Sequence, residues 1–199
     1  MDYLAVLSYE HLDNNFFLKS FARTVARKKG RGILLHSDSE HTERIIQTGV
    51  MREDAEVRAL KELNTRLVSL LADEGVSSIG IHGHQKSAIR LQGKEVIVEK
   101  KAFESLPPVP LLILSGLLES DMGRPSKAPL SAMAYALQIL YNIPEITIFS
   151  KKKDVELLTD GFPYKIIPSE TDMEFKEVHL PEEFYNYDKP VILQSPTTF

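Results

Sequence analysis

Histidines follow two of the strands that the sequence predicts, and they are the first candidates for chemistry in this chain. His36 follows one apolar run, with Asp38 two positions later, and His82 and His84 follow another. Imidazole nitrogens bind zinc, and a His-x-His pair at a strand end can provide two ligands. One hypothesis is therefore a metal-dependent enzyme that uses these four side chains. We favour hydrogen-bonding residues with no metal, because no further acidic or cysteine ligand stands at a suitable spacing.

The turns after the first two predicted strands lack the glycines of phosphate-binding loops. Such loops need glycine because backbone N–H groups must approach phosphate oxygens closely at the start of a helix. Neither G-x-x-x-x-G-K-[ST] nor G-x-G-x-x-G occurs, and the two turns read Ser8-Tyr9-Glu10-His11 and His36-Ser37-Asp38-Ser39-Glu40. Acidic side chains at these points would repel a polyphosphate. The sequence therefore predicts no nucleotide site of ordinary design.

Two further groups of residues are weaker candidates. The run Lys151–Lys153 could neutralise a phosphate, but a run of this kind is more often a solvated loop. Ser37 and Ser115 could act as nucleophiles, but no G-x-S-x-G segment surrounds either serine.

Composition and charge exclude several classes of protein. The chain has 199 residues, of which 43% are hydrophobic, so a sizeable core is available and overall disorder is excluded. A formal charge of −4 argues against a dedicated nucleic-acid binder. Cysteine is absent, which removes disulfides, thiolate metal sites and cysteine nucleophiles.

Neither a signal peptide nor a membrane-spanning segment is indicated. Asp2 follows Met1 directly, and Tyr9-Glu10-His11 interrupts the first apolar run. The longest apolar segment, Val109–Leu114, is far shorter than the ~20 residues that a membrane helix needs. We therefore expect a soluble, cytoplasmic protein that contacts neither membranes nor nucleic acid.

Strand-like and helix-like segments alternate along the chain. The clearest helix runs from about Glu53 to Asp73, where apolar residues recur at intervals of three and four and Gly75 follows as a C-terminal cap. Asn14 caps a helix that ends near Lys29. Further helices are expected over residues 40–47, over 129–141 and up to about 158. Strands are expected over 4–7, 33–35, 77–81, 109–114, 146–149, 164–167 (an edge strand) and 191–193, with a hairpin over 89–98 and a loop over 121–127.

This alternation predicts the fold class. Continuous apolar strands between amphipathic helices indicate an α/β fold, a three-layer αβα sandwich with a mostly parallel central sheet. We expect one domain over residues 1–199. Ligands of such folds bind in the crevice beyond the carboxyl ends of the strands. The polar residues that end the strands are therefore expected to converge there: Ser8, His36 to Ser39, His82 to Gln85, Ser115 and Ser150.

Four segments follow one another along the chain: Leu34 to Ser39, Gly49 to Glu56, Asn64 to Leu71, and Gly80 to Gln85. In their order and spacing they resemble the amino acid kinase superfamily, particularly N-acetylglutamate kinase and aspartokinase. In that family a strand ends in V-H-G-G-G, a G-L-R-x-T-D-A-E segment precedes a long helix with N-x-x-L-V-x-L-L, and G-L-S-G-K-D follows. Weaker similarity continues at Val109 to Ile113, Lys127 to Ala132 and Ile148 to Val155. The resemblance implies an amino-acid-kinase-like fold.

The resemblance also implies that the phosphate-binding residues have changed. Leu7 stands at the family's lysine position after the first strand, and Tyr9-Glu10 replaces Gly-Gly. The arginine that holds the substrate carboxylate corresponds to Met51, with Arg52 adjacent. The two aspartates of the nucleotide side correspond to Pro129 and Lys151. Phosphoryl transfer depends on positioning and charge neutralisation, and each group that the family uses for it differs here.

The leading hypothesis is therefore an amino-acid-kinase-fold protein without kinase activity. It would need no cofactor and would bind a small amino-acid-like ligand or a partner. The resemblance also implies a homodimer, because the long-helix region often builds a dimer in the family. The expected crevice residues are Ser8, Tyr9, His36, Ser37, Asp38, Arg52, His82, Gly83, His84 and Gln85. The alternative is an active kinase of an amino-acid-like carboxylate, with ATP and Mg²⁺, that uses Lys86, Arg90 and Lys151–Lys153.

Overall fold

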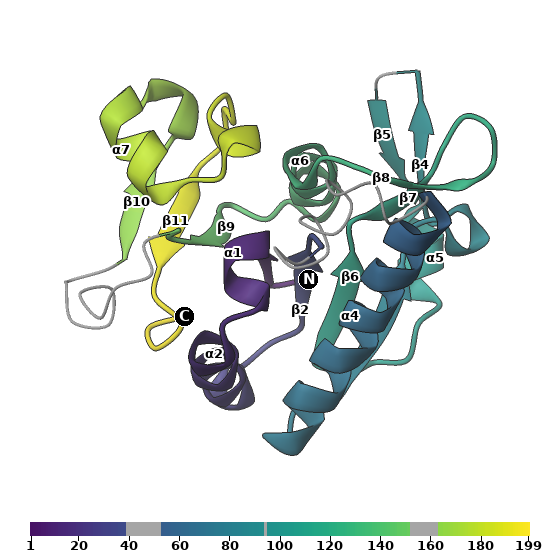
Figure 1. Cartoon of the computed structure of the whole chain (residues 1–199), viewed down its shortest axis with the longest axis horizontal. Helices are drawn as coiled ribbons and strands as arrows, with labels where there is room; N and C mark the ends of the chain where they lie inside the picture. Colours follow the sequence, from purple (N-terminus) through teal and green to yellow (C-terminus); the bar gives the residue numbers. More distant parts are fainter. Residues whose placement is uncertain (39–52, 94, 152–162) are drawn as a thin grey trace.

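A large, mostly parallel sheet runs through the molecule (Figure 1). The computed structural model describes residues 1–38, 53–93, 95–151 and 163–199. Among these residues, seven strands pair in the order β10-β11-β9-β1-β2-β6-β3. All neighbours are parallel except β10 and β11. The strands are β1 (Tyr3–Leu7), β2 (Gly32–His36), β3 (Ser78–His82), β6 (Leu111–Ser115), β9 (Ile146–Phe149), β10 (Tyr164–Ile166) and β11 (Val191–Gln194).

Helices cover both faces of this sheet because alternate strand residues point to opposite sides. On β1, Leu4 and Val6 belong to the core that α6 (Leu130–Tyr141) completes. Ala5 and Leu7 belong to the core that α2 (Asn15–Arg27) and α4 (Glu53–Asp73) complete. The three-layer αβα sandwich and the mostly parallel sheet are therefore confirmed.

A second, smaller sheet stands beside the β3 end of the large one (Figure 1). Its strands pair in the order β5-β4-β7-β8, and they are β4 (Ile89–Gln92), β5 (Glu95–Val98), β7 (Leu117–Glu119) and β8 (Pro125–Lys127). The expected hairpin is the β4–β5 pair. The expected loop over 121–127 is wrong for its last three residues, because β8 pairs with β7 across a turn closed by a hydrogen bond from Gly123 N to Ser120 O. Strands this short, one of which starts at a proline, carry no alternating pattern that would reveal them.

The remaining described elements are short helices that the sequence analysis did not predict. They are α1 (Tyr9–Leu12), α5 (Lys100–Glu104), α7 (Met173–His179) and the 3-10 helices η1 (Gln85–Ser87), η3 (Pro168–Glu170) and η4 (Glu182–Phe184). The helix expected over 40–47 and the one expected up to about 158 lie outside the described residues. Within the described part, none of the helices has the length and hydropathy needed to cross a membrane.

Both helix-end signals that the sequence predicted are present. The Asn14 side chain accepts a hydrogen bond from Phe17 N at 3.0 Å and so caps α2. Gly75 follows α4 with a φ of +80°, while Val76 N donates to Leu71 O at 2.9 Å. This is the left-handed cap that glycine adopts at least cost.

Replacing Gly75 by alanine is expected to lower the free energy of unfolding by about 1 kcal/mol, because a Cβ is unfavourable at positive φ. No atom lies within 4 Å of the added Cβ, so the cost comes from the backbone and not from a clash. Urea unfolding measures it, and Gly75→Asn is the matched control, because asparagine tolerates this conformation better. An alanine variant as stable as the parent would contradict the assigned cap.

Candidate functional site

The carboxyl ends of four neighbouring strands lie at one edge of the large sheet. In the register of the sheet, Leu7 pairs with His36, His36 with Ser115, and Ser115 with His82. Both His36 and Ser115 have no exposed surface. The strand ends at His36, Ser115 and His82 therefore lie side by side, and part of this cluster is sealed inside the protein.

His36 is held in a closed hydrogen-bond network. Its Nδ1 donates to Ser37 O at 2.7 Å, and its Nε2 accepts from Asn64 Nδ2 at 3.0 Å. Asn64 Nδ2 also donates to Ile113 O at 2.9 Å, which identifies it as the amide nitrogen. Burial lowers the pKa of His36 to about 4. His36 is thus a neutral structural residue whose two ring nitrogens are both occupied, and it is unsuited to binding a metal.

His82 is the last residue of β3 and His84 lies in the turn after it, and both rings are also held neutral. His82 Nδ1 is 2.8 Å from Ser115 Oγ, and the His82 and His84 rings stack with centroids 5.9 Å apart. Burial, His84 and Lys61 lower the pKa of His82 to about 4. Burial also lowers the pKa of His84, and Lys61 lowers it further. Within the described part of the chain, no group of three His, Asp or Glu side chains is placed to hold a metal ion.

Gly83, between these histidines, is required by packing. A Cβ there would overlap Leu117 O and lie 2.9 Å from the Ile89 Cβ. The glycine therefore lets the end of β3 approach the small sheet. This packing accounts for the glycine at position 83, so no phosphate-binding role is needed to explain it.

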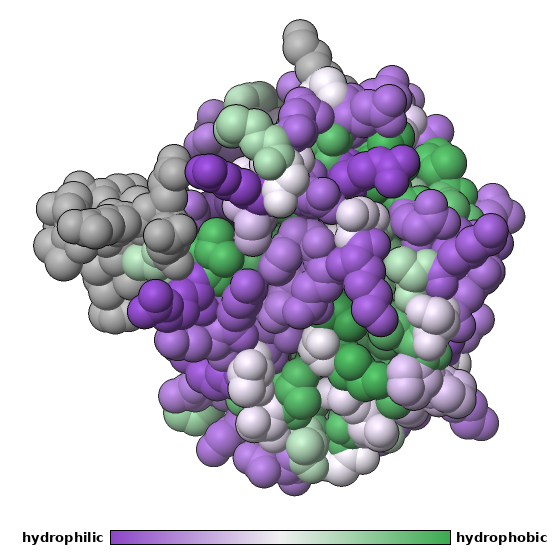
Figure 2. All heavy atoms as spheres, turned by 90° about the vertical axis from the view of Figure 1, so that its right-hand side faces the viewer, coloured by the Kyte–Doolittle hydropathy of each residue, from purple (hydrophilic) through white to green (hydrophobic). Residues whose placement is uncertain are grey.

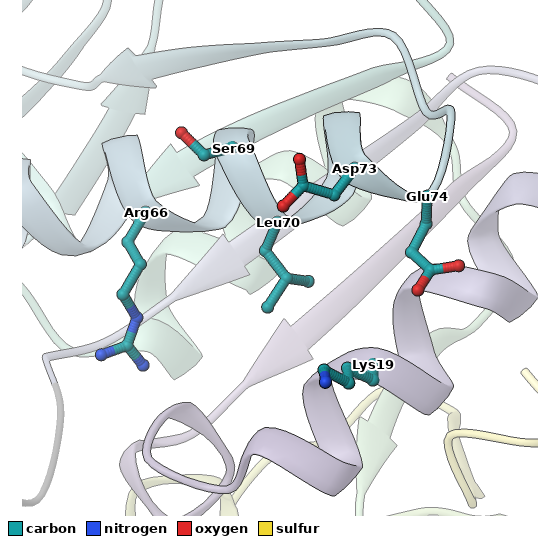
Figure 3. A pocket seen from close by; sticks show the side chains of 6 residues that line it. All are labelled: Lys19, Arg66, Ser69, Leu70, Asp73 and Glu74. Carbon is teal, nitrogen blue, oxygen red and sulfur yellow. The ribbon is translucent and has the colours of Figure 1, made fainter.

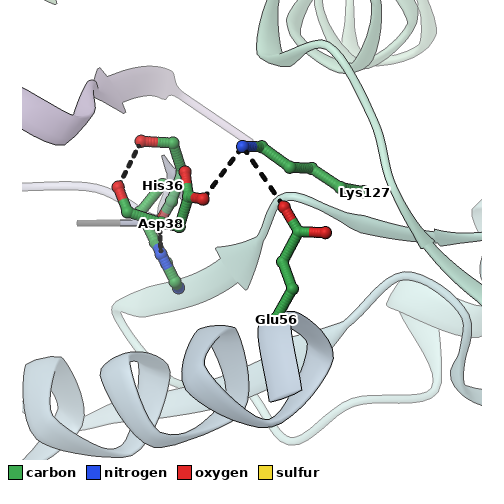
Figure 4. Close-up of polar contacts among 5 residues, drawn as sticks. His36, Asp38, Glu56 and Lys127 are labelled. Carbon is green, nitrogen blue, oxygen red and sulfur yellow. Dashed lines mark hydrogen bonds and ion pairs between the residues drawn. The ribbon is translucent and has the colours of Figure 1, made fainter. Parts of the chain in front are cut away.

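Asp38 and Lys127 form an ion pair close to the carboxyl end of β2 (Figure 4). Lys127 Nζ, at the end of β8, lies 2.9 Å from Asp38 Oδ2 and 3.5 Å from Glu56 Oε1 on α4. The Asp38 side chain is 3% exposed, and that of Lys127 is 38% exposed. The buried carboxylate is therefore paired, while the lysine also reaches solvent.

The amino-terminal end of α6 is occupied by a carboxylate from elsewhere in the chain. Glu183 Oε2, on η4, accepts a hydrogen bond from Ser131 N at 3.2 Å, and Leu130 N also donates to this carboxylate. Burial raises the pKa of Glu183, while the two N–H groups and Lys127 lower it. Free N–H groups at a helix start attract anions, and here Glu183 already satisfies them.

A crevice of about 410 Å³ lies over these groups. It is lined by Ser37, Leu60, Gly116, Lys127, Ala128, Pro129, Leu130 and Glu183. A separate cavity of about 550 Å³ lies beside β3. A third, smaller groove of about 250 Å³ is lined by residues of α2 and α4 and by the residue after α4: Lys19, Arg66, Ser69, Leu70, Asp73 and Glu74. Figure 3 shows these side chains.

The predicted site residues divide between these places. Ser37 lines the crevice, and Asp38 pairs with its lysine. His82, Gly83 and Gln85 line the cavity beside β3, whereas His84 lines neither. Ser8 Oγ is 3.1 Å from His11 Nδ1, and His11 Nε2 lies 2.9 Å from Ser150 O. Arg52 and the side chain of Tyr9 lie outside the described part of the chain.

Sequence reasoning did not single out three residues that shape the site. Asn64 interrupts the apolar stripe of α4, and a buried polar residue on such a stripe is a signal that could have been used. Lys127 appeared only as part of a resembling segment. Glu183 lies 52 positions from its partner Ser131, and no local pattern connects the two.

Solved structures of low sequence identity share the fold of this chain. An isopentenyl phosphate kinase aligns with a TM-score of 0.61 over 98% of this chain and 91% of its own, at 10% identity. The aspartate kinase of Synechocystis aligns with a TM-score of 0.56 over 75% of this chain and 28% of its own, at 10% identity. The chain has the amino acid kinase fold. No protein-family profile and no curated protein sequence matches it.

A third structure with the amino acid kinase fold covers nearly the whole chain. It is the N-acetylglutamate synthase of Neisseria gonorrhoeae, complexed with coenzyme A and N-acetyl-glutamate, with a TM-score of 0.64 and 9% identity. The alignment covers 98% of this chain and 54% of the synthase, so this chain spans about half the length of that protein. In the chain described here, helix α1 begins at Tyr9, two residues after the end of β1. At this position the sequence resemblance implies two glycines in the kinases.

Proposed function

We propose that this chain binds a small amino-acid-like ligand in the strand-end crevice and does not transfer a phosphoryl group. The observation that carries the proposal is the Glu183 carboxylate on the N–H groups of α6, next to the paired Asp38 and Lys127. Catalysis of phosphoryl transfer needs cations and N–H donors directed at the phosphate oxygens. In this crevice the donors and the lysine already serve carboxylates.

The electrostatics of the crevice disfavour a nucleotide. A unit negative charge about 4 Å from a carboxylate is repelled by roughly 4 kcal/mol at the effective dielectric of a partly buried site. Asp38, Glu56 and Glu183 all lie close to Lys127, and Glu10 acts on Glu183 as a further negative charge. A triphosphate would therefore meet several acidic groups around one paired cation.

An amino acid suits the same groups better. Its ammonium can bind Glu183, and its carboxylate can bind Lys127, whose side chain is 38% exposed. The apolar wall formed by Leu60, Ala128 and Leu130 can accommodate a short side chain. Two neighbours of the same fold support this class: the N-acetylglutamate synthase was solved with N-acetyl-glutamate, and an aspartokinase with aspartate and ADP.

Thermal-shift titration tests both halves of the proposal. We expect no stabilisation by ATP–Mg²⁺ and a rise in Tm with at least one member of a panel of amino acids and N-acetyl amino acids. Lys127→Gln should abolish that rise, whereas Lys165→Gln, which removes an exposed lysine paired with Glu145, should keep it. Phosphate transfer from ATP to a panel member would establish the kinase alternative instead. If no member of the panel raises the Tm, the proposal of an amino-acid-like ligand is overturned.

The homodimer implied by the resemblance remains a proposal. Light scattering at several protein concentrations measures the mass directly, and a mass of about 22.5 kDa throughout would reject it.

A further inference from the structure

The cavity beside β3 is built from the outer edge of the large sheet and from α5. Its volume is about 550 Å³. Ile79, Ile81 and Leu114 provide apolar surface from the sheet, and Phe103 and Leu106 provide it from α5 and the segment that follows. Figure 2 shows the side of the molecule that carries α4 and the small sheet, where hydrophobic residues group among hydrophilic ones. A volume and lining of this kind are typical of small-molecule sites, which span roughly 300–1,000 Å³.

Polar groups enter this cavity from the carboxyl end of β3 and the turn after it. They belong to His82, Gln85 and Lys86. The buried Ser115 hydroxyl lies 2.8 Å from His82 Nδ1, and this contact holds the ring in place. The neutral ring carries its hydrogen on Nε2 where the hydroxyl donates to Nδ1, and on Nδ1 where the hydroxyl accepts. The carboxyl end of β3 therefore presents two hydrogen-bonding side chains and one cation.

Lys86 is held in place by an unusual backbone. Lys86 has φ 53° and ψ 29°, and Ser87 has φ 52°. A left-handed conformation costs an L-residue other than glycine roughly 1–2 kcal/mol, and consecutive examples are uncommon. Such strain persists where the surrounding structure fixes it, and it is concentrated at functional positions. Here it lies at Lys86, an exposed residue in the wall of the cavity.

The charges around the cavity favour an anion. Lys86 lines it, and Lys61 on α4 is close enough to His82 to lower its pKa. None of the described lining residues carries a carboxylate. An anionic head group would therefore meet a cation and two neutral hydrogen-bonding side chains, while the apolar walls would contact an apolar body.

We propose that this cavity is a binding site for an amphipathic carboxylate, with the apolar chain between β3 and α5 and the carboxylate at Lys86, Gln85 and His82. The site shares no lining residue with the strand-end crevice. It is independent of the proposed function, since it requires neither an amino acid ligand nor the loss of phosphoryl transfer.

Titration of the full chain with octanoate, followed by calorimetry, tests the proposal. We expect octanoate to bind and 1-octanol, which lacks the charge, to bind about tenfold more weakly. Lys86→Asn should weaken octanoate binding about tenfold without destabilising the protein, because asparagine tolerates the left-handed backbone. Ala102→Leu, which fills space in the cavity wall, should weaken octanoate and octanol alike.

Lys29→Asn is the matched control, because it removes the same charge from an exposed position after α2. It should leave octanoate binding unchanged. The proposal is overturned if octanoate does not bind, or if it binds Lys86→Asn and Ala102→Leu as tightly as the parent chain. An amino acid found by the thermal-shift panel should not compete with octanoate, and competition would show that the two sites are one.

Discussion

Lowering the pH from 7 to about 4.5 is expected to cost this protein on the order of 2 kcal/mol of stability through His36 alone. The pKa of His36 is lowered to about 4 in the folded protein, whereas an unfolded histidine titrates near its ordinary value of 6.5. Between these two values the unfolded chain binds a proton that the folded chain excludes, so acid favours unfolding. The contribution is complete above pH 6.5 and is lost as the pH falls toward 4.

Urea unfolding between pH 7 and 4.5 measures this effect. His36→Gln removes the titrating group and retains an acceptor for Asn64, so its stability should fall less steeply with acid than that of the parent. His84→Gln is the control, because that ring is partly exposed and its removal should change the slope much less. Parallel pH profiles for the parent and His36→Gln would show that the ring is not held neutral.

Other groups also contribute to the acid profile, which is why the comparison of variants matters. His82, whose folded pKa is also near 4, acts in the same direction but is only half-buried, so solvent screening reduces its effect. Glu183 acts in the opposite direction: its raised pKa makes the folded protein take up a proton more readily than the unfolded chain. Its carboxylate therefore costs stability at neutral pH, and that cost disappears on acidification.

Periodicity and helix-end chemistry predicted most of the fold correctly. The spacing of apolar residues over 53–73 predicted both ends of α4 correctly. An apolar stripe that repeats over several helical turns and is followed by a glycine is compatible with few structures other than a helix. Asn14 and Gly75 were recognised because capping is local. The failures are short segments, such as α7 and β8, whose structure comes from tertiary contacts and not from their own pattern.

The candidate site was less accessible to sequence reasoning for a related reason. The alternation of strand-like and helix-like segments predicts that His36 and His82 lie at strand ends. Whether such a ring is buried or exposed depends on which side chains of other elements pack against it. Asn64 sits there on α4, 28 positions from His36, and determines that His36 is structural. In the same way Glu183 determines the chemistry of the α6 amino-terminus from a distant part of the chain.

Replacing Asn64 by alanine is expected to lower the free energy of unfolding by about 2–4 kcal/mol. Its Nδ2 is the donor to both His36 Nε2 and Ile113 O, and a buried acceptor that loses its donor costs roughly 1–3 kcal/mol. Thr65→Ala is the control, because Thr65 is the next residue on the same helix and is exposed. Its effect should stay within about 0.5 kcal/mol.

Gly80 provides a sharper test of the same network. A Cβ at Gly80 would overlap Asn64 Oδ1, so Gly80→Ala should destabilise the parent chain by displacing the amide from its two acceptors. In the Asn64→Ala background the amide is gone, and the added methyl should cost much less. The double-mutant cycle should therefore deviate from additivity by at least about 1 kcal/mol. Additive effects would mean that Gly80 does not make room for the amide.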